Sequence, residues 1–84
     1  MKIVFSKHSR NQMVERNISE DKIISALSSP DKTIAQSQGK FQAVKLTKKN
    51  GKKYLIVAVY RRINSTKRVI TAFLTTKIKK YLLK

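Results

Sequence analysis

The dipeptide Asn50-Gly51, flanked on both sides by strand-forming residues, restricts the fold of this chain more than any other feature. Both residue types tolerate the positive φ angles of a two-residue type I′ turn, so the segment predicts a β-hairpin. A two-residue loop also sets the register of the two strands. It places Val44 opposite Val57 and Leu46 opposite Leu55.

This register divides the side chains of the hairpin between two faces, because successive residues of a strand point in opposite directions. One face is almost wholly apolar, and we expect it to pack on the helices. It comprises Gln42, Val44, Leu46, Leu55, Val57 and Val59. The other face mixes aromatic, small and basic side chains, and we expect it to be open. It comprises Phe41, Ala43, Lys45, Thr47, Tyr54, Ile56, Ala58 and Tyr60.

Apolar periodicity and capping residues predict the other elements. These are a first strand over 3–5, helices over 9–17 and 20–29, an edge strand over 32–38, a strand over 67–74 and a last helix after Thr76. Ser9 and Ser19 are the expected N-caps, and Asn17 and Pro30 end the two helices. The fold class is therefore α+β in the order β-α-α-β-β-β-β-α, with two N-terminal helices and a C-terminal helix on one face of a twisted antiparallel sheet. The whole chain, 1–84, is expected to form one domain.

Charge narrows the class of partner. The chain has twenty Lys and Arg and only four Asp and Glu, which gives a net charge of +16, and no Asp or Glu follows Asp31. A positive field of this size repels itself and attracts polyanions by releasing their condensed counterions. A nucleic acid or an acidic protein is the partner this composition favours.

Several classes of function are disfavoured. Without cysteine and with one histidine, the chain predicts no disulfide and no metal site, and no cofactor is expected. The longest apolar run, Leu55 to Tyr60, is too short to span a bilayer, and the N-terminus resembles no secretion signal, so we expect a cytoplasmic protein without membrane contact. Two glycines cannot form a Gly-rich phosphate loop.

Three residues are candidates for acid–base chemistry on RNA, which can be cleaved without a metal. His8 carries the only imidazole, a group that titrates near neutral pH, although it can equally cap a turn. Lys45 lies in mid-strand on the mixed face and can bind phosphate or act as a base, or simply be solvated. Tyr60 can stack a base, or can pair structurally with Phe41 across the hairpin.

Basic residues around the second hairpin are candidates for phosphate contact, because the arginine guanidinium binds phosphate through a bidentate fork. This group comprises Arg61, Arg62, Lys67 and Arg68. A solubilising basic loop is the alternative. Arg16 can reach the sheet from the first helix, or can form an ion pair with Glu20.

The stretch from Phe5 to Pro30 resembles the opening of a family of small bacterial and archaeal domains of unknown function, related to the BrnT-type and RelE-type toxins of toxin–antitoxin pairs. The shared pattern is a histidine at a strand end, an arginine before a small turn residue, Ile-Ser-Glu, and a helix closed by Ser-Pro. These positions are His8, Arg16, Asn17, Ile18, Ser19, Glu20 and Ser29-Pro30. The segments 43–45, 55–60 and 69–72 look like strands of the same family. Asn17 stands where glycine is usual, and asparagine also tolerates the left-handed conformation.

The resemblance implies a RelE/barnase-like fold whose open sheet face handles RNA, including mRNA on the ribosome. It also implies metal-independent endoribonuclease activity and neutralisation by a small acidic antitoxin. The first hypothesis is therefore an RNA-binding, ribonuclease-like toxin. The alternatives are a non-catalytic nucleic-acid-binding domain and a basic protein-interaction module.

Overall fold

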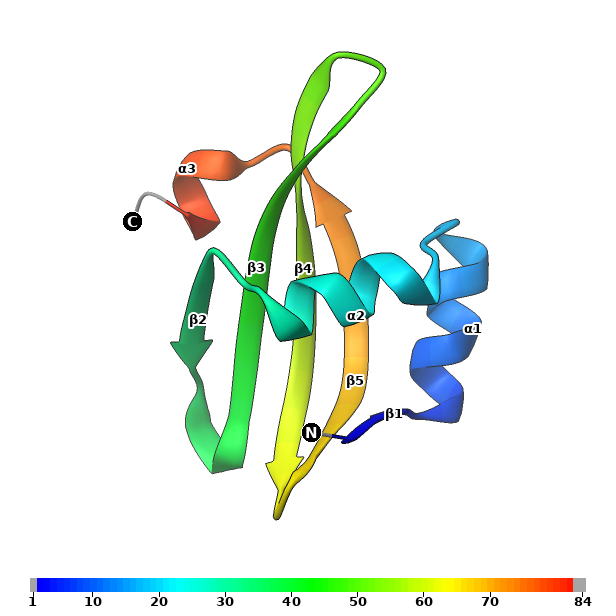
Figure 1. Cartoon of the computed structure of the whole chain (residues 1–84), viewed down its shortest axis with the longest axis vertical. Helices are drawn as coiled ribbons and strands as arrows, with labels where there is room; N and C mark the ends of the chain where they lie inside the picture. The colour runs from blue at the N-terminus through cyan, green and yellow to red at the C-terminus, as the bar shows by residue number, and fades with distance from the viewer. Residues whose placement is uncertain (1, 83–84) are drawn as a thin grey trace.

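The structure, a computed structural model that describes residues 2–82, is an α+β fold with the predicted order of elements (Figure 1). The strands are β1 (Lys2–Phe5), β2 (Lys32–Ala35), β3 (Lys40–Lys49), β4 (Lys52–Ile63) and β5 (Thr66–Thr75). The helices are α1 (Lys7–Glu15), α2 (Glu20–Ser28) and α3 (Ile78–Tyr81), with one 3₁₀ turn at Ser37–Gly39. The strands form one sheet in the order β1-β5-β4-β3-β2.

The β3–β4 hairpin has the predicted turn and register. Asn50 and Gly51 have φ angles of 53° and 80°, as a type I′ turn requires. Val44 pairs with Val57 and Leu46 with Leu55 along two antiparallel strands. The hairpin prediction is therefore confirmed. It could be made from the sequence because it depends on local turn chemistry alone.

The sheet is mixed rather than wholly antiparallel. β2–β3, β3–β4 and β4–β5 are antiparallel pairs, but β1 pairs with β5 in parallel, with Phe5 opposite Val69. Hairpin turns dictate antiparallel pairing between consecutive strands. Sixty residues separate β1 from β5 (Phe5 to Thr66), so no turn dictates their relative direction.

The first helix begins earlier than predicted. Ser6, not Ser9, is its N-cap, and the Ser6 hydroxyl accepts a hydrogen bond from the Ser9 backbone N–H at 3.1 Å. The predicted end is confirmed: Asn17 has a φ of 54°, and the N–H of Ile18 donates to the Met13 carbonyl at 2.9 Å. This left-handed ending turns the chain directly into α2, whose N-cap is Ser19 as expected.

The two N-terminal helices cover the face that the sequence predicts to be open. Ile23 and Leu27 of α2 and Met13 of α1 belong to one buried cluster with Ala43, Ala58, Tyr60, Val69 and Ala72 of the sheet. The prediction that Val44 and Val57 face these helices is therefore wrong. The physical reason is steric: register places Ala43 beside Ala58 and Ala58 beside Ala72, and this row of small side chains lets a helix approach closely.

The apolar face carries the short C-terminal helix instead. Val44, Leu55 and Val57 are fully buried against Phe73 of β5 and Ile78, Tyr81 and Leu82 at the C-terminal end. Since Ala43 and Val44 are neighbours in one strand, α3 lies on the sheet face opposite α1 and α2. The helices thus occupy both faces, and the expectation of a single helical face is wrong.

The single turn of α3 leaves the other half of its face uncovered. α3 has four residues, and the cluster beneath it ends at Val57. Val59 is half-buried, and Ile63 is 48% exposed. An open half-sheet therefore runs from Val59 toward the β4–β5 turn.

Ala58→Leu is expected to destabilise the fold by about 1–3 kcal/mol, because the larger side chain separates α2 from its alanine row. Urea denaturation measures the loss. The matched control is Val59→Leu, one residue along on the open half-sheet, where a change within about 0.5 kcal/mol is expected. Equal stabilities for the two variants would contradict this placement of α2.

Candidate nucleic-acid interface

Lys45 lies beneath α2 and not on an open face. Its ammonium donates to the backbone carbonyl of Ser29, the C-cap of α2, at 3.0 Å. Lys67 does the same from β5, donating to the Leu27 carbonyl at 2.9 Å. A helix C-terminus carries partial negative charge and unpaired carbonyls, so both lysines stabilise α2.

Tyr60 is also on the helix-covered face, 5% exposed. Its ring stacks on Phe41 with centroids 5.6 Å apart, and the ammonium of Lys67 lies 5.2 Å from its centroid. Burial raises the pKa of the Tyr60 phenol, and the nearby Arg62 guanidinium opposes this with a smaller effect. The prediction that Tyr60 and Lys45 lie on an open face together is wrong, and the structural pairing with Phe41 is confirmed.

Arg16 forms a hydrogen bond at the edge of the sheet formed by β5. Its guanidinium donates to the Ala72 carbonyl at 2.6 Å, on the part of β5 that lies beyond the end of β1. The alternative ion pair with Glu20 is wrong, because Arg10 takes that partner at 2.5 Å. Pairing this carbonyl, which β1 does not reach, blunts an edge that could otherwise join another strand.

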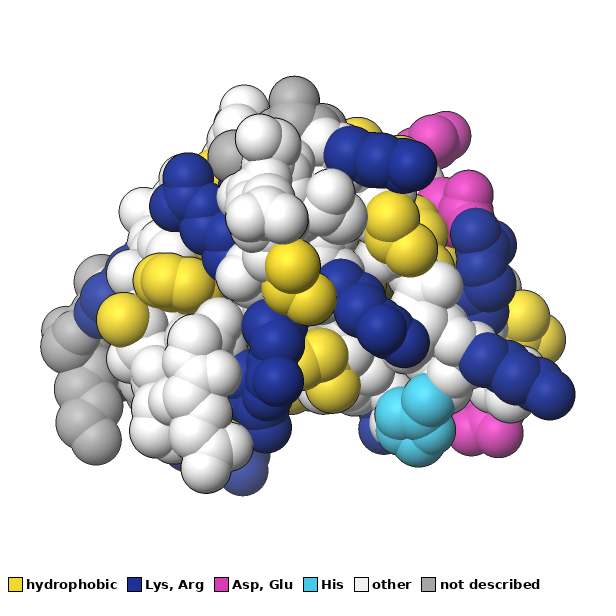
Figure 2. All heavy atoms as spheres, turned by 90° about the horizontal axis from the view of Figure 1, so that it is seen from below, with side chains coloured by type: hydrophobic (Ala, Val, Ile, Leu, Met, Phe, Trp, Pro, Cys, Tyr) yellow, Lys and Arg dark blue, Asp and Glu magenta, His cyan; other side chains and the backbone are white. Residues whose placement is uncertain are grey.

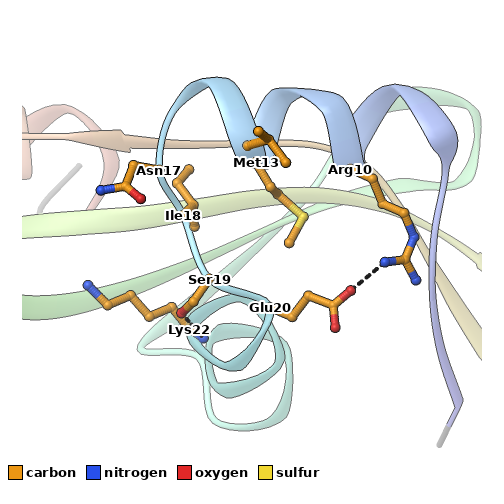
Figure 3. Close-up of a pocket in the computed structure, with 8 residues that line it drawn as sticks. Arg10, Met13, Asn17, Ile18, Ser19, Glu20 and Lys22 are labelled. Atoms are coloured by element: carbon orange, nitrogen blue, oxygen red, sulfur yellow. Dashed lines mark hydrogen bonds and ion pairs between the residues drawn. The ribbon is translucent and has the colours of Figure 1, made fainter.

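The Arg10–Glu20 ion pair closes one side of a hollow of about 480 Å³ between α1 and α2 (Figure 3). Met13 and Ile18 form its apolar floor, and Asn17 and Lys22 stand at the opposite end. This junction brings together one acid and two cations, and it contains none of the predicted site residues.

Strand alternation splits the basic group around the β4–β5 turn. Arg61 pairs with Arg68, and Arg62 pairs with Lys67. Because successive residues face opposite ways, Arg62 and Lys67 lie on the helix side of the sheet. Arg61 and Arg68 lie on the open half-sheet.

A third cation extends this pair across the sheet. Lys40 of β3 is the register partner of Arg61, so three neighbouring strands carry one cation each in a single line. We call Lys40, Arg61 and Arg68 the basic row. Sequence reasoning missed Lys40, although the register predicted from Asn50-Gly51 already placed it opposite Arg61.

His8 joins the basic row at a hollow of about 310 Å³, lined by Ser6, His8, Arg61, Ile63, Arg68 and Ile70. His8 is exposed on the first turn of α1. Figure 2 shows Lys and Arg side chains gathered on this end of the molecule, with the histidine near them at the border of a depression. Of the predicted site residues, the structure brings together His8, Arg61 and Arg68.

Arg61 has an incompletely satisfied guanidinium. Within residues 2–82 its Nε is the buried side-chain atom without a hydrogen-bond partner. A buried donor left unpaired costs about 1–3 kcal/mol. The hollow therefore combines an unpaired donor, a second arginine and an imidazole, an arrangement suited to an oxyanion such as a phosphate.

Within residues 2–82, no three His, Cys, Asp or Glu side chains group in a way that could hold a metal ion. In the same part of the chain, no helix has the length and hydropathy of a membrane span.

The fold and the basic row define a small α+β domain with a cationic, half-open sheet. The chain belongs to the family described as "Domain of unknown function (DUF4258)", whose model matches residues 5–74. The matched range includes His8 and the basic row and ends before α3. No curated protein and no solved structure matches the chain.

Tyr60→Phe is expected to remove a stability loss at alkaline pH. The raised pKa means that the folded state keeps the phenol proton above pH 10.0, where the unfolded state releases it. Stability from this group is complete below that pH and declines as pH rises toward the folded pKa. Urea denaturation of both proteins from pH 8 to 11 measures the difference in free energy of unfolding. A difference that stays constant over this range would contradict the burial of the phenol.

Proposed function

We propose that this protein binds RNA through the basic row. The single observation that carries the proposal is the line of Lys40, Arg61 and Arg68 across three strands, on the half of the sheet that α3 leaves uncovered. A cationic surface of this kind suits a phosphate backbone, since phosphate contacts supply most of the affinity for nucleic acids.

The apolar side chains around the row support a single-stranded ligand. Ile63 and Val4 are exposed near Arg61 and Arg68, and the hollow also contains Ile70. Unstacked bases have apolar faces that can rest on such side chains, while the phosphates contact the cations. The resemblance of residues 5–30 to BrnT- and RelE-type toxins favours RNA over DNA and adds an acidic antitoxin as a protein partner in the cytoplasm.

A metal-independent ribonuclease is the second candidate function, favoured by the place of His8 beside Arg61 and Arg68. In this reaction the imidazole would take the proton of a ribose 2′-OH, and the oxygen would attack the adjacent phosphorus. The bond from phosphorus to the 5′-oxygen of the next nucleotide would break, which leaves a 2′,3′-cyclic phosphate, and the departing oxygen would take up a proton from water. The two guanidinium groups would stabilise the added negative charge on the phosphorus oxygens.

The catalytic role predicted for Lys45 and Tyr60 does not enter this proposal. Lys45 is hydrogen-bonded to the end of α2, and Tyr60 is buried under the helices. Both side chains lie on the sheet face opposite the basic row.

The double variant Arg61→Gln with Arg68→Gln is expected to weaken single-stranded RNA binding and to flatten its salt dependence. Each lost phosphate contact lowers the slope of log K against log salt by about 0.7. Fluorescence anisotropy across a salt series measures both. The matched control, Arg62→Gln with Lys67→Gln, removes the same charge from the next register pair of the same two strands, on the other face. It should lose stability through the α2 cap and keep the slope.

Equal slopes for the two double variants would contradict binding at the basic row. Binding of RNA by neither variant nor the original chain at low salt would contradict the proposed function as a whole.

His8→Ala is expected to lower RNA cleavage in EDTA by about 10²–10⁴-fold, the usual contribution of a general base, with RNA binding retained. Gel analysis of fragments measures the rate, and anisotropy measures the binding. The control is Lys79→Ala, which removes a cation of α3 and should cleave RNA as the original chain does. Intact RNA at high protein excess would contradict ribonuclease activity and leave RNA binding as the proposed function.

A further inference from the structure

Lysines lie at the tip of the β3–β4 hairpin, at the end of the molecule away from the basic row. Register pairs Lys48 with Lys53, and Lys52 directly follows the Asn50-Gly51 turn. We call Lys48, Lys52 and Lys53 the lysine tip. Figure 1 shows the hairpin, in green, extending beyond α2, α3 and the end of β5.

The pairing of Lys48 with Lys53 opposes folding. Like charges directly opposite each other on neighbouring strands destabilise a sheet. The strands cannot slip to separate them, because the turn and the buried pair Val44–Val57 hold the register. The carboxylate nearest in sequence, Asp31, is engaged elsewhere, accepting the Leu46 N–H at 2.7 Å. An anion from outside the chain would relieve this repulsion.

A hollow of about 760 Å³ lies beside the tip. Its polar lining consists of ammonium, hydroxyl and amide groups without a carboxylate, and its apolar lining comes from two side chains. The lining residues are Asn50, Lys52, Lys53, Tyr54, Leu74, Thr75, Thr76 and Lys77. Ammonium groups and hydroxyls together are the donors that proteins use for phosphate oxygens.

We propose that the lysine tip and this hollow form a second phosphate-binding site, which contacts the same RNA as the basic row. This inference rests on the proposed function. Lys53 and Arg61 are eight residues apart in β4, or about 26 Å at 3.3 Å per residue. Lys53 lies on the same sheet face as Arg61, with α3 over the strand between them. A long RNA strand that passes beside α3 can therefore reach both sites, and a short oligonucleotide can reach only one.

The first test measures RNA binding by Lys52→Gln with Lys53→Gln. The expected result is a salt slope lower by about 1.4 for a long single-stranded RNA, from two lost contacts of about 0.7 each. A short oligonucleotide should show no change, because it binds the basic row alone. The matched control is Lys7→Gln with Lys79→Gln, which removes the same charge from exposed helix positions and should keep both slopes.

The second test measures thermal unfolding without RNA. Lys53→Glu places an opposite charge across from Lys48, so its melting temperature at low salt should exceed that of the original chain. High salt should remove the gain, because it screens the repulsion. Inorganic tripolyphosphate should raise the melting temperature of the original chain more than that of Lys53→Glu. Lys79→Glu is the control and should respond to tripolyphosphate as the original chain does.

The outcomes separate the two proposals. RNA binding that depends on Arg61 and Arg68 but not on Lys52 and Lys53 would overturn the second site and leave the proposed function standing. No RNA binding, with a tripolyphosphate response that Lys53→Glu loses, would support the site for phosphate and overturn the proposed function. A tripolyphosphate response that Lys53→Glu retains in full would overturn the site.

Discussion

The close packing of α2 on the sheet is the contact on which the rest of the structure depends. Ala43, Ala58 and Ala72 follow one another across three strands, and their small side chains leave room for Ile23 and Leu27. Packing at this density resists even small increases in volume. Lysines from the sheet then reach the last carbonyls of the helix, so a surface rich in cations stabilises the helix end electrostatically as well as by packing.

The position of α2 determines which part of the sheet is left exposed to solvent. α1 and α2 cover the face with Ala43, Ala58 and Ala72, which we call the alanine face. The opposite face, with Val44 and Val57, is the valine face, and the single turn of α3 covers only about half of it. The uncovered half carries the basic row. The cations of the chain thus have two physical roles. Lys45, Lys67 and Arg16 donate to backbone carbonyls inside the fold, whereas Arg61 and Arg68 line a hollow with no internal acid in its lining.

Much of the fold was predictable, and the parts that were share a local cause. The hairpin at Asn50-Gly51, the left-handed end of α1 at Asn17 and the cap at Ser19 each depend on a few consecutive residues. The errors involve longer range. The valine face was assigned to α1 and α2 on hydrophobicity alone. The alanines were not recognised as the surface on which a helix packs. The same error placed Lys45 and Tyr60 in the site. The basic group, which looks continuous along the chain, was not divided between the two faces, although strand alternation requires it.

The amino-acid order alone settled the β3–β4 register, the sequence of elements and the strong positive charge, because turn chemistry and composition need no partner from elsewhere in the chain. Tertiary packing settled which face each helix covers, the parallel direction of β1 and the meeting of His8 with Arg61 and Arg68. Strand alternation yields two candidate faces, and hydrophobicity alone favours the one with Val44 and Val57. Choosing between them depends on how closely a helix can approach each one, and that is a property of three strands together.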